Sequence, residues 1–255
     1  MPKTPETVEV EFISPRHLAG GGDPAWITVP LHRACGWSHG NDPLMPRVIL
    51  SSPDQKALLR LEPDPDGQWW TLHHAPTSDR PAWYASFGAR TPVEITAAFT
   101  DALAAPVTTS TAWADPYEPL QQTDWSPAAG ADGLVSPDGT AYVQRLGAGP
   151  WFVTATLGPD RMVWQARFGE HTPPYLIAAF TAALTDPSPV PRTDSPRSFP
   201  TRNPDLVTRS HREVPAVQVA SALEERVQAL AARRAGRTTS PSALRPPPPR
   251  NGRSR

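Results

Sequence analysis

The chain has 255 residues, with 34 prolines, 16 glycines and a single cysteine, and its formal net charge is −1. That charge is divided: residues 1–190 carry 11 basic against 20 acidic side chains, whereas residues 191–255 carry 13 arginines against 5 acidic side chains. A lone cysteine excludes an intrachain disulfide, no apolar run reaches the ~18 residues of a membrane span, and no secretory signal is recognisable, so we expect a cytoplasmic protein without membrane contact.

The first predicted element lies within residues 1–36, which we expect to form a strand extension packed on the unit that follows. The runs VEVEFI at 8–13 and WITVPL at 26–31 both resemble strands. Residues 20–22 are all glycine. A glycine run cradles phosphate when a helix follows it, and here a strand-like run follows, so we interpret the run as a turn.

The middle of the chain contains an internal duplication. Segments 83–106 and 164–187 lie 81 residues apart and share 13 identities in 24 aligned positions. Self-similarity at a fixed offset indicates that one structural unit is repeated. We place the two copies at residues 37–106 and 125–187, with a linker at 107–124.

Each copy is predicted to fold as β-β-β-β-α. A Ser-Pro-Asp tripeptide, typical of turns, occurs in both copies, and short alternating runs bounded by turn residues indicate strands. Thr91-Pro92-Val93-Glu94 matches a capping box at the start of the first helix, and Tyr175 replaces the glutamate in the second copy. The expected strands are 48–50, 57–61, 69–74 and 83–87 in the first copy, and 134–135, 141–146, 151–157 and 162–168 in the second.

The fold class is therefore α+β: two tandem units, each an antiparallel sheet with one helix, packed about a pseudo-twofold axis. Alternate strand residues share a face, so the residues that match between the copies fall on one side of each sheet. We expect this side to be the core beneath the helices; the alternative is a tryptophan row open for stacking. The core candidates are Trp70, Trp83, Phe87, Ile95, Phe99 and Leu103 in the first copy, and Trp151, Trp164, Phe168, Leu176, Phe180 and Leu184 in the second.

These motifs resemble the SPDY-motif domain, an actinomycete domain of unknown function that usually occurs in two copies per chain. The resemblance rests on the Ser-Pro-Asp starts, on a tryptophan strand, and on W-x-A-x-F-G-x-x-T-P leading into an alanine-rich helix. The segment SPRHLAGGGDPAW at 14–26 is similar to the one that precedes the first copy in the family. Gln55 and Gly139 stand where the motif has its tyrosine. The resemblance implies an architecture and no activity.

The C-terminal quarter is predicted to be largely disordered. Residues 188–213 are rich in Pro, Arg, Ser and Thr, and residues 237–255 are basic and proline-rich. Between them, 214–236 has the period of an amphipathic helix ending near Gly236. The apolar stripe of this helix, Val217, Leu223, Val227 and Leu230, is the candidate site for an unknown protein partner.

Motifs of known chemistry are missing from the chain, which has no G-x-S-x-G, no H-E-x-x-H and no nucleotide-binding glycine loop. His32, Cys35 and His39 are weak metal candidates, because their spacing matches no closed zinc site. His73 and His74 are adjacent in a predicted strand, so their rings point to opposite faces. We predict no catalytic residues and no cofactor.

Three classes of function stay open. The first is a non-enzymatic binding or interaction protein. The second is a single-stranded nucleic-acid-binding protein, because tandem β-β-β-β-α units share the topology of PUR-repeat and Whirly proteins and the tail can contact nucleic acid non-specifically. The third is an enzyme with an unrecognised site.

Overall fold

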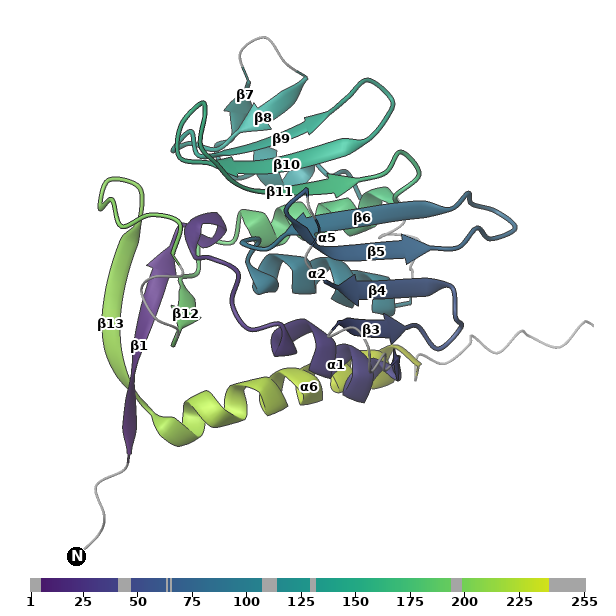
Figure 1. Cartoon of the computed structure of the whole chain (residues 1–255), viewed down its shortest axis with the longest axis horizontal. Helices are drawn as coiled ribbons and strands as arrows, with labels where there is room; N and C mark the ends of the chain where they lie inside the picture. Colours follow the sequence, from purple (N-terminus) through teal and green to yellow (C-terminus); the bar gives the residue numbers. More distant parts are fainter. Residues whose placement is uncertain are drawn as a thin grey trace, which may run out of the picture.

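The computed structural model describes residues 6–40, 47–62, 64, 66–106, 114–128, 132–193 and 199–238. A ten-stranded antiparallel sheet forms the centre, and a separate three-stranded sheet stands beside it (Figure 1). The strand order of the large sheet is β2-β3-β4-β5-β6-β11-β10-β9-β8-β7. Its strands are β2 Ser38–Gly40, β3 Val48–Ser51, β4 Ala57–Leu61, β5 Gln68–His74, β6 Trp83–Gly88, β7 Ser126–Pro127, β8 Gly133–Val135, β9 Ala141–Arg145, β10 Trp151–Thr156 and β11 Met162–Phe168.

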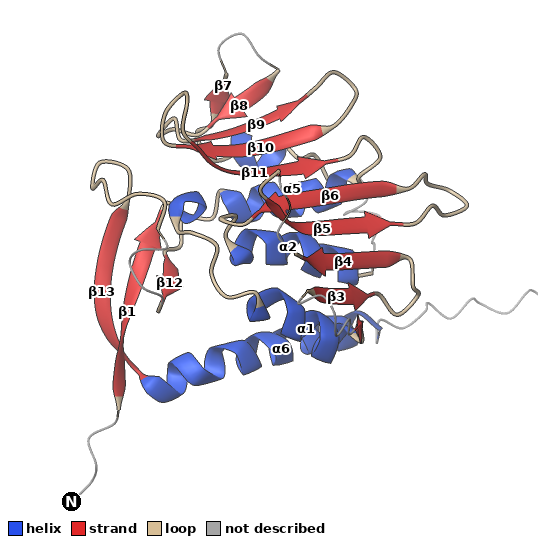
Figure 2. Cartoon of the chain, in the orientation of Figure 1, coloured by secondary structure: helices blue, strands red, loops and turns tan. Residues whose placement is uncertain are grey.

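The two copies are joined edge to edge. The last strand of each copy, β6 and β11, pair antiparallel, with Ser86 opposite Arg167. Outward from this junction the strands of the two halves follow in mirrored order, which is the arrangement that a pseudo-twofold axis produces. The helices α2 (Val93–Ala104) and α5 (Pro174–Leu184) lie side by side on one face of the sheet, and the other face is open (Figure 2).

The shared core forms where the two helices cross the strand junction. Phe87, Phe99, Phe168 and Phe180 are fully buried, and their ring centroids lie 5.2 to 5.8 Å apart. The core candidates named above are buried, apart from Leu103, which is half-buried and packs against the core. Because each phenylalanine contacts residues of the other copy, neither half closes its own core.

The N-terminal extension differs from the expectation. β1 (Thr7–Ser14) is a strand, but WITVPL belongs to the helix α1 (Ala25–Cys35), which packs on α2 and covers the first copy. A carboxylate oxygen of Asp23 accepts a hydrogen bond from the Ala25 N–H at 2.8 Å, which satisfies one of the open N–H groups at the start of this helix. β1 itself is not on the first copy, because Ile13 and the 3-10 turn η1 (Arg16–Leu18) pack with Leu157 and Val163 of the second copy.

The segment 188–213, expected to be disordered, contributes two strands within its described part. β12 (Val190–Arg192) and β13 (Thr208–Pro215) flank β1 in the three-stranded sheet, here called the wing. The C-terminal helix α6 (Ala216–Thr238) follows directly and runs past Gly236, two residues beyond the predicted end. Residues 239–255 of the expected tail lie outside the described residues, as do 107–113 of the linker, which also holds the short helix α4 (Glu118–Gln121).

The Ser-Pro-Asp tripeptide is a structural turn in both copies. The Ser52 hydroxyl accepts the Ala57 N–H at 2.9 Å and donates to the Asp54 carboxylate, and Ser136 makes the same contacts with Ala141 and Asp138. The family's tyrosine position has a left-handed backbone in this chain, with φ of 59° at Gln55 and 71° at Gly139. Glycine adopts this conformation without strain.

Candidate functional site

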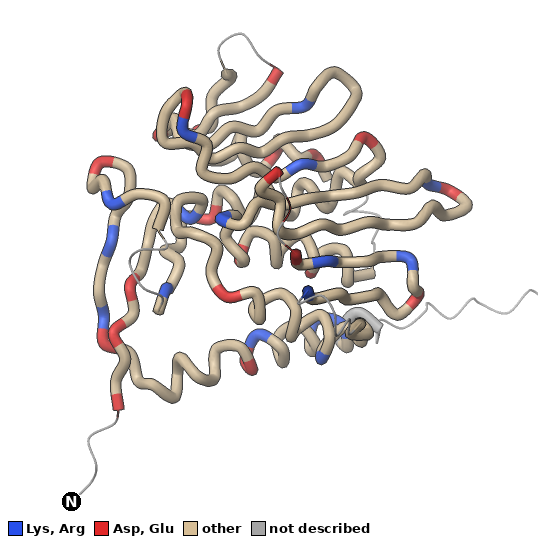
Figure 3. The backbone as a smooth tube through the Cα atoms, viewed as in Figure 1, with Lys and Arg blue, Asp and Glu red and all other residues tan. Residues whose placement is uncertain are grey.

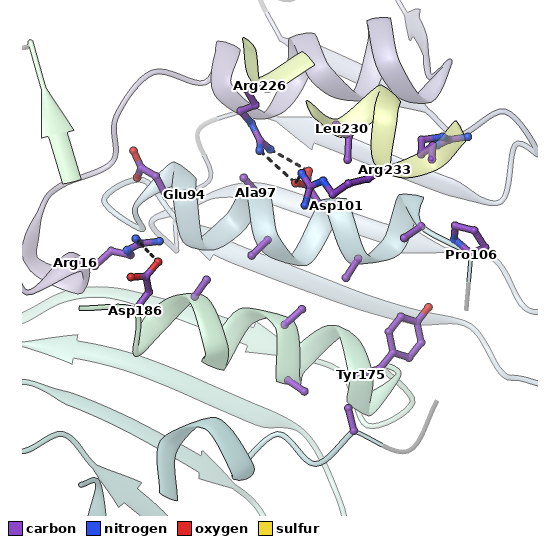
Figure 4. Close-up of a pocket in the computed structure, with 18 residues that line it drawn as sticks. Arg16, Glu94, Ala97, Asp101, Pro106, Tyr175, Asp186, Arg226, Leu230 and Arg233 are labelled. Carbon is purple, nitrogen blue, oxygen red and sulfur yellow. Dashed lines mark hydrogen bonds and ion pairs between the residues drawn. The ribbon is translucent and has the colours of Figure 1, made fainter. Parts of the chain in front are cut away.

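A groove of about 620 Å³ lies on the outer side of the helix layer, between α2, α5 and α6 (Figure 4). Its floor is alanine from both copies. Three pairs are related by the repeat offset: Ala97 with Ala178, Ala98 with Ala179, and Ala102 with Ala183. Small side chains let the two helices lie close together and leave the hollow above them.

Several of the charged groups around this groove form ion pairs with one another. Arg16 bonds Asp186 at 2.6 Å at one end, and Arg226 of α6 bonds Asp101 of α2 at 2.9 Å (Figure 4). Arg233 reaches the same Asp101 at 3.4 Å. These ion pairs fasten η1 and α6 to the helix layer.

The C-terminal helix is docked on the body of the protein. Val227 and Leu230 are 6% and 3% exposed, and Leu230 belongs to the main core. The apolar stripe is therefore not available to a partner along its C-terminal half, contrary to the expectation from its sequence. Val217 is 75% exposed, and Leu223 is half-buried beside the wing.

The three metal candidates occupy separate environments. His32 Nδ1 lies 2.8 Å from the Trp37 carbonyl oxygen, Cys35 is buried at the end of α1, and His39 is on β2. Burial raises the pKa of the Cys35 thiol, although Arg234 opposes this shift. In the described part of the chain, no three His, Cys, Asp or Glu side chains are grouped to hold a metal ion.

The open face of the ten-stranded sheet carries exposed aromatic side chains. Trp69, Tyr84 and Tyr142 are 42%, 45% and 37% exposed, and Phe152 is half-buried. All four alternate with buried residues of their strands, so they point away from the helices. Exposed Trp and Tyr side chains on one face of a sheet offer flat rings for stacking.

One row of side chains crosses this face at matched register. Arg60 of β4 is followed by Thr71, Ser86, Arg167, Phe152 and Gln144 on successive strands. The Arg60 Nε is buried and has no hydrogen-bond partner in the described structure. Arg167 bonds the Gln165 side chain at 2.8 Å and lies 3.9 Å from the exposed Asp66. The row thus places two arginines on either side of the small residues Thr71 and Ser86.

The face differs in charge from the rest of the body. None of these ten strands contains an aspartate or glutamate, and the acidic side chains of the described residues lie in loops, in helices and in the strands of the wing (Figure 3). Burial, and then the nearby positive charge of Arg60, lower the pKa of His73, so this imidazole is neutral at pH 7. The positive charge of the face therefore comes from its arginines.

The comparisons with known proteins agree with the architecture. The SPDY domain, described as a domain of unknown function (DUF317), matches residues 51–108 and 135–190, so this chain carries two tandem copies of that domain. No curated protein and no solved structure matches the chain. None of the helices in the described part of the chain combines the length and apolar character of a membrane span.

From the sequence alone, the face opposite the core is predicted to be solvated. Tyr84 and Ser86 in one copy correspond to Gln165 and Arg167 in the other, and the difference between the copies at these positions is what favours solvent there. The available signal was aromatic residues at outward strand positions, Trp69 among them. Aromatic side chains are common in strands, and only the pairing of β6 with β11 brings these outward positions onto one face.

Proposed function

We propose that this protein is a non-catalytic binding protein of the cytoplasm that holds single-stranded nucleic acid on the open face of its ten-stranded sheet. The observation that carries the proposal is the composition of that face: exposed aromatics beside Arg60 and Arg167, with no carboxylate in any of the ten strands. Bases stack on such rings whatever their sequence, and arginines contact the phosphates.

The acidic body does not oppose this assignment at short range. Residues 1–190 carry a net charge of −9. Salt screens the repulsion from carboxylates that lie farther than a Debye length of ~8–10 Å from the bound strand, whereas arginines in direct contact with it are screened much less. We expect modest affinity with a marked salt dependence. The arginines of residues 191–255 add attraction that is independent of the face.

The test is a titration of labelled single-stranded DNA, single-stranded RNA and duplex DNA with the full chain at two salt concentrations. Replacing Trp69 and Tyr84 together by alanine is expected to weaken single-strand binding at least tenfold, because each stacked base contributes ~1–3 kcal/mol. Arg167→Gln is expected to lower the slope of log K against log salt by about 0.7. The matched control, Val217→Ala, changes an exposed side chain away from the ten-stranded sheet and leaves binding unchanged.

Binding that survives the Trp69 and Tyr84 replacements would place nucleic acid on the arginine-rich C-terminal residues and end the proposal. A second candidate is a protein partner on the same face, since Trp, Tyr and Arg are the residues enriched at the centres of protein interfaces. A folded chain that binds none of the oligonucleotides favours that candidate.

A further inference from the structure

A second cavity, of about 550 Å³, lies between the wing and the first half of α6. The wing stands at one side of the molecule, and α6 leaves the lower end of β13 and runs beneath α1 (Figure 1). The cavity walls are Val10 and Phe12 of β1, Trp26 of α1, and Val219 and Leu223 of α6. The groove of Figure 4 and the open sheet face lie elsewhere, so this site is independent of both.

The lining is apolar on three sides. Val10 is only 3% exposed, while Phe12, Trp26 and Leu223 are half-buried. Strand alternation places Val10 and Phe12 on the same face of the wing, and this face is turned toward α6. A concave site of this volume with aromatic and aliphatic walls fits a small ligand that buries an apolar body.

The mouth of the cavity carries an arginine without an acidic partner. Arg212 lies opposite Val10 in register, and its guanidinium carbon is 5.1 Å from the Phe12 ring centroid. The described structure gives this exposed side chain no hydrogen bond and no ion pair. By contrast, Arg226, which stacks on the Trp26 ring, forms an ion pair with Asp101. Arg209, which shares strand β13 with Arg212, forms an ion pair with Glu11. Arg212 is held in place by stacking, with its N–H donors left for another group.

Two acidic residues, Asp23 and Glu213, also border the cavity. One oxygen of Asp23 accepts the Ala25 N–H at 2.8 Å at the start of α1. Glu213 is exposed and lies opposite Glu9 in register, so alternation directs it to the other face of the wing. Trp26, Thr193 and Gln218 offer uncharged donors, so among the residues that line the cavity Arg212 is the one that offers positively charged N–H donors to an incoming head group. We propose that this cavity binds a small amphipathic anion, with an apolar chain or ring between Phe12, Trp26 and Leu223 and a carboxylate or similar head on Arg212.

The test uses three probes that share a ten-carbon chain and differ in the head group: decanoate, decanol and decylammonium, each below its micelle concentration. Each displaces the neutral fluorophore 1-aminoanthracene from the full chain at pH 7. The expected order of affinity is decanoate, then decanol, then decylammonium, with decanoate about tenfold tighter than decanol because its contact with Arg212 is charge-assisted.

Arg212→Gln is expected to remove the preference for decanoate and leave decanol binding unchanged. Arg202→Gln, which deletes one exposed arginine elsewhere, keeps the preference. Leu223→Trp fills the cavity and is expected to weaken all three probes at least fivefold, with an unchanged melting temperature showing that the chain is folded. Equal affinities for the three probes in the wild type, tighter binding of decylammonium, or a preference that survives Arg212→Gln would each overturn the proposal.

Discussion

The two SPDY copies differ most where their helices begin. At α2, the Val93 N–H donates to the Gly21 carbonyl at 2.8 Å, and Glu94 pairs with the buried Arg192 of the wing. At α5, Pro173 and Pro174 have no N–H to donate, and the same end borders an open cavity of about 380 Å³. The glycine run therefore packs against the start of α2 and covers this end of the first copy. A Cβ on Gly21 would lie 2.5 Å from the Ala89 oxygen, so only glycine fits there.

At the Ser-Pro-Asp ends it is the second copy, not the first, that the N-terminal segment contacts. In the first copy, the His74 ring stacks on Trp83 at 5.1 Å. The repeat offset puts Ala155 at the equivalent place in the second copy. There the indole N–H of Trp164 donates a hydrogen bond to the backbone carbonyl oxygen of His17 at 2.8 Å. One copy covers its tryptophan with its own strand, and the other uses the N-terminal segment. The duplicated core is common to both, and the flanking segments make the halves different.

The largest loss of stability is expected for a substitution in the core that the two copies share. Phe168→Ala removes a fully buried ring that contacts Phe87, Phe99 and Phe180, so it is expected to cost about 3–5 kcal/mol in the free energy of unfolding. Urea denaturation followed by tryptophan fluorescence should show one transition, because the core is shared. Phe152→Ala on the open face is the matched control and should cost much less. Two separated transitions in the wild type would contradict the shared core.

The next largest effect is expected for the ion pair that joins the wing to α2 of the first copy. Glu94→Gln leaves the Arg192 guanidinium buried, with the Ala19 and Gly20 carbonyls but no charge partner, and is expected to cost about 3 kcal/mol. The equivalent residue of the second copy is Tyr175. Tyr175→Phe leaves every ion pair intact and should change the melting temperature little. Similar losses for the two variants would mean that the cover contributes nothing specific.

Local patterns predicted most of the elements in the repeated units. The eight expected strands are present within one residue of their predicted ends, and a helix follows the last strand of each copy as expected, because turn residues and alternation are local signals. The prediction of four strands per copy was wrong, because each copy has a further short strand at the sheet edge, β2 in the first and β7 in the second. The capping box was wrong in detail. Pro92 is the N-cap residue, the Thr91 hydroxyl is buried without a partner in the described structure, and Glu94 turns to Arg192. A partner 98 residues away cannot be read from a four-residue motif.

The wing and the N-terminal helix required information that a single sequence does not display. β13 pairs with β1 across about 200 residues, and its polar composition resembles a disordered segment when considered alone. WITVPL alternates like a strand, yet it forms a helix because Ile27 and Leu31 fit against α2 and the core. Tertiary packing overrides a short apolar run of this kind. The open face likewise depends on the non-local pairing of β6 with β11.

A smaller effect distinguishes the two Ser-Pro-Asp turns, because their aspartates contribute differently to the pH dependence of stability. Burial would raise the pKa of Asp138, but hydrogen bonds from His17 and Ser136 outweigh it and lower that pKa well below its usual range. A depressed carboxyl pKa stabilises the fold above the unfolded value of ~3.9, and the stabilisation is lost as the pH falls toward the folded pKa. Asp138→Asn should therefore remove about 1–2 kcal/mol of acid-dependent stability, measured by urea denaturation between pH 6 and pH 2.5. Asp54→Asn should change that profile less, because no histidine hydrogen bond lowers the pKa of Asp54 and the charge of His74 is the smallest of its causes. Equal changes would count against the role of His17.

The smallest effect concerns the glycine that ends the last strand of each copy. A Cβ on Gly169 would lie 2.9 Å from the Tyr84 ring, whereas a Cβ on Gly88 meets Gln165 and Trp164 at 3.4 Å. Gly169→Ala is therefore expected to cost about 1 kcal/mol, more than Gly88→Ala, and Tyr84→Ala should suppress the difference in a double-mutant cycle. Because Tyr84 belongs to the proposed nucleic-acid surface, Gly169→Ala should also weaken oligonucleotide binding while Gly88→Ala does not. Loss of binding in both variants would point to a general disturbance of the sheet instead of a displaced ring.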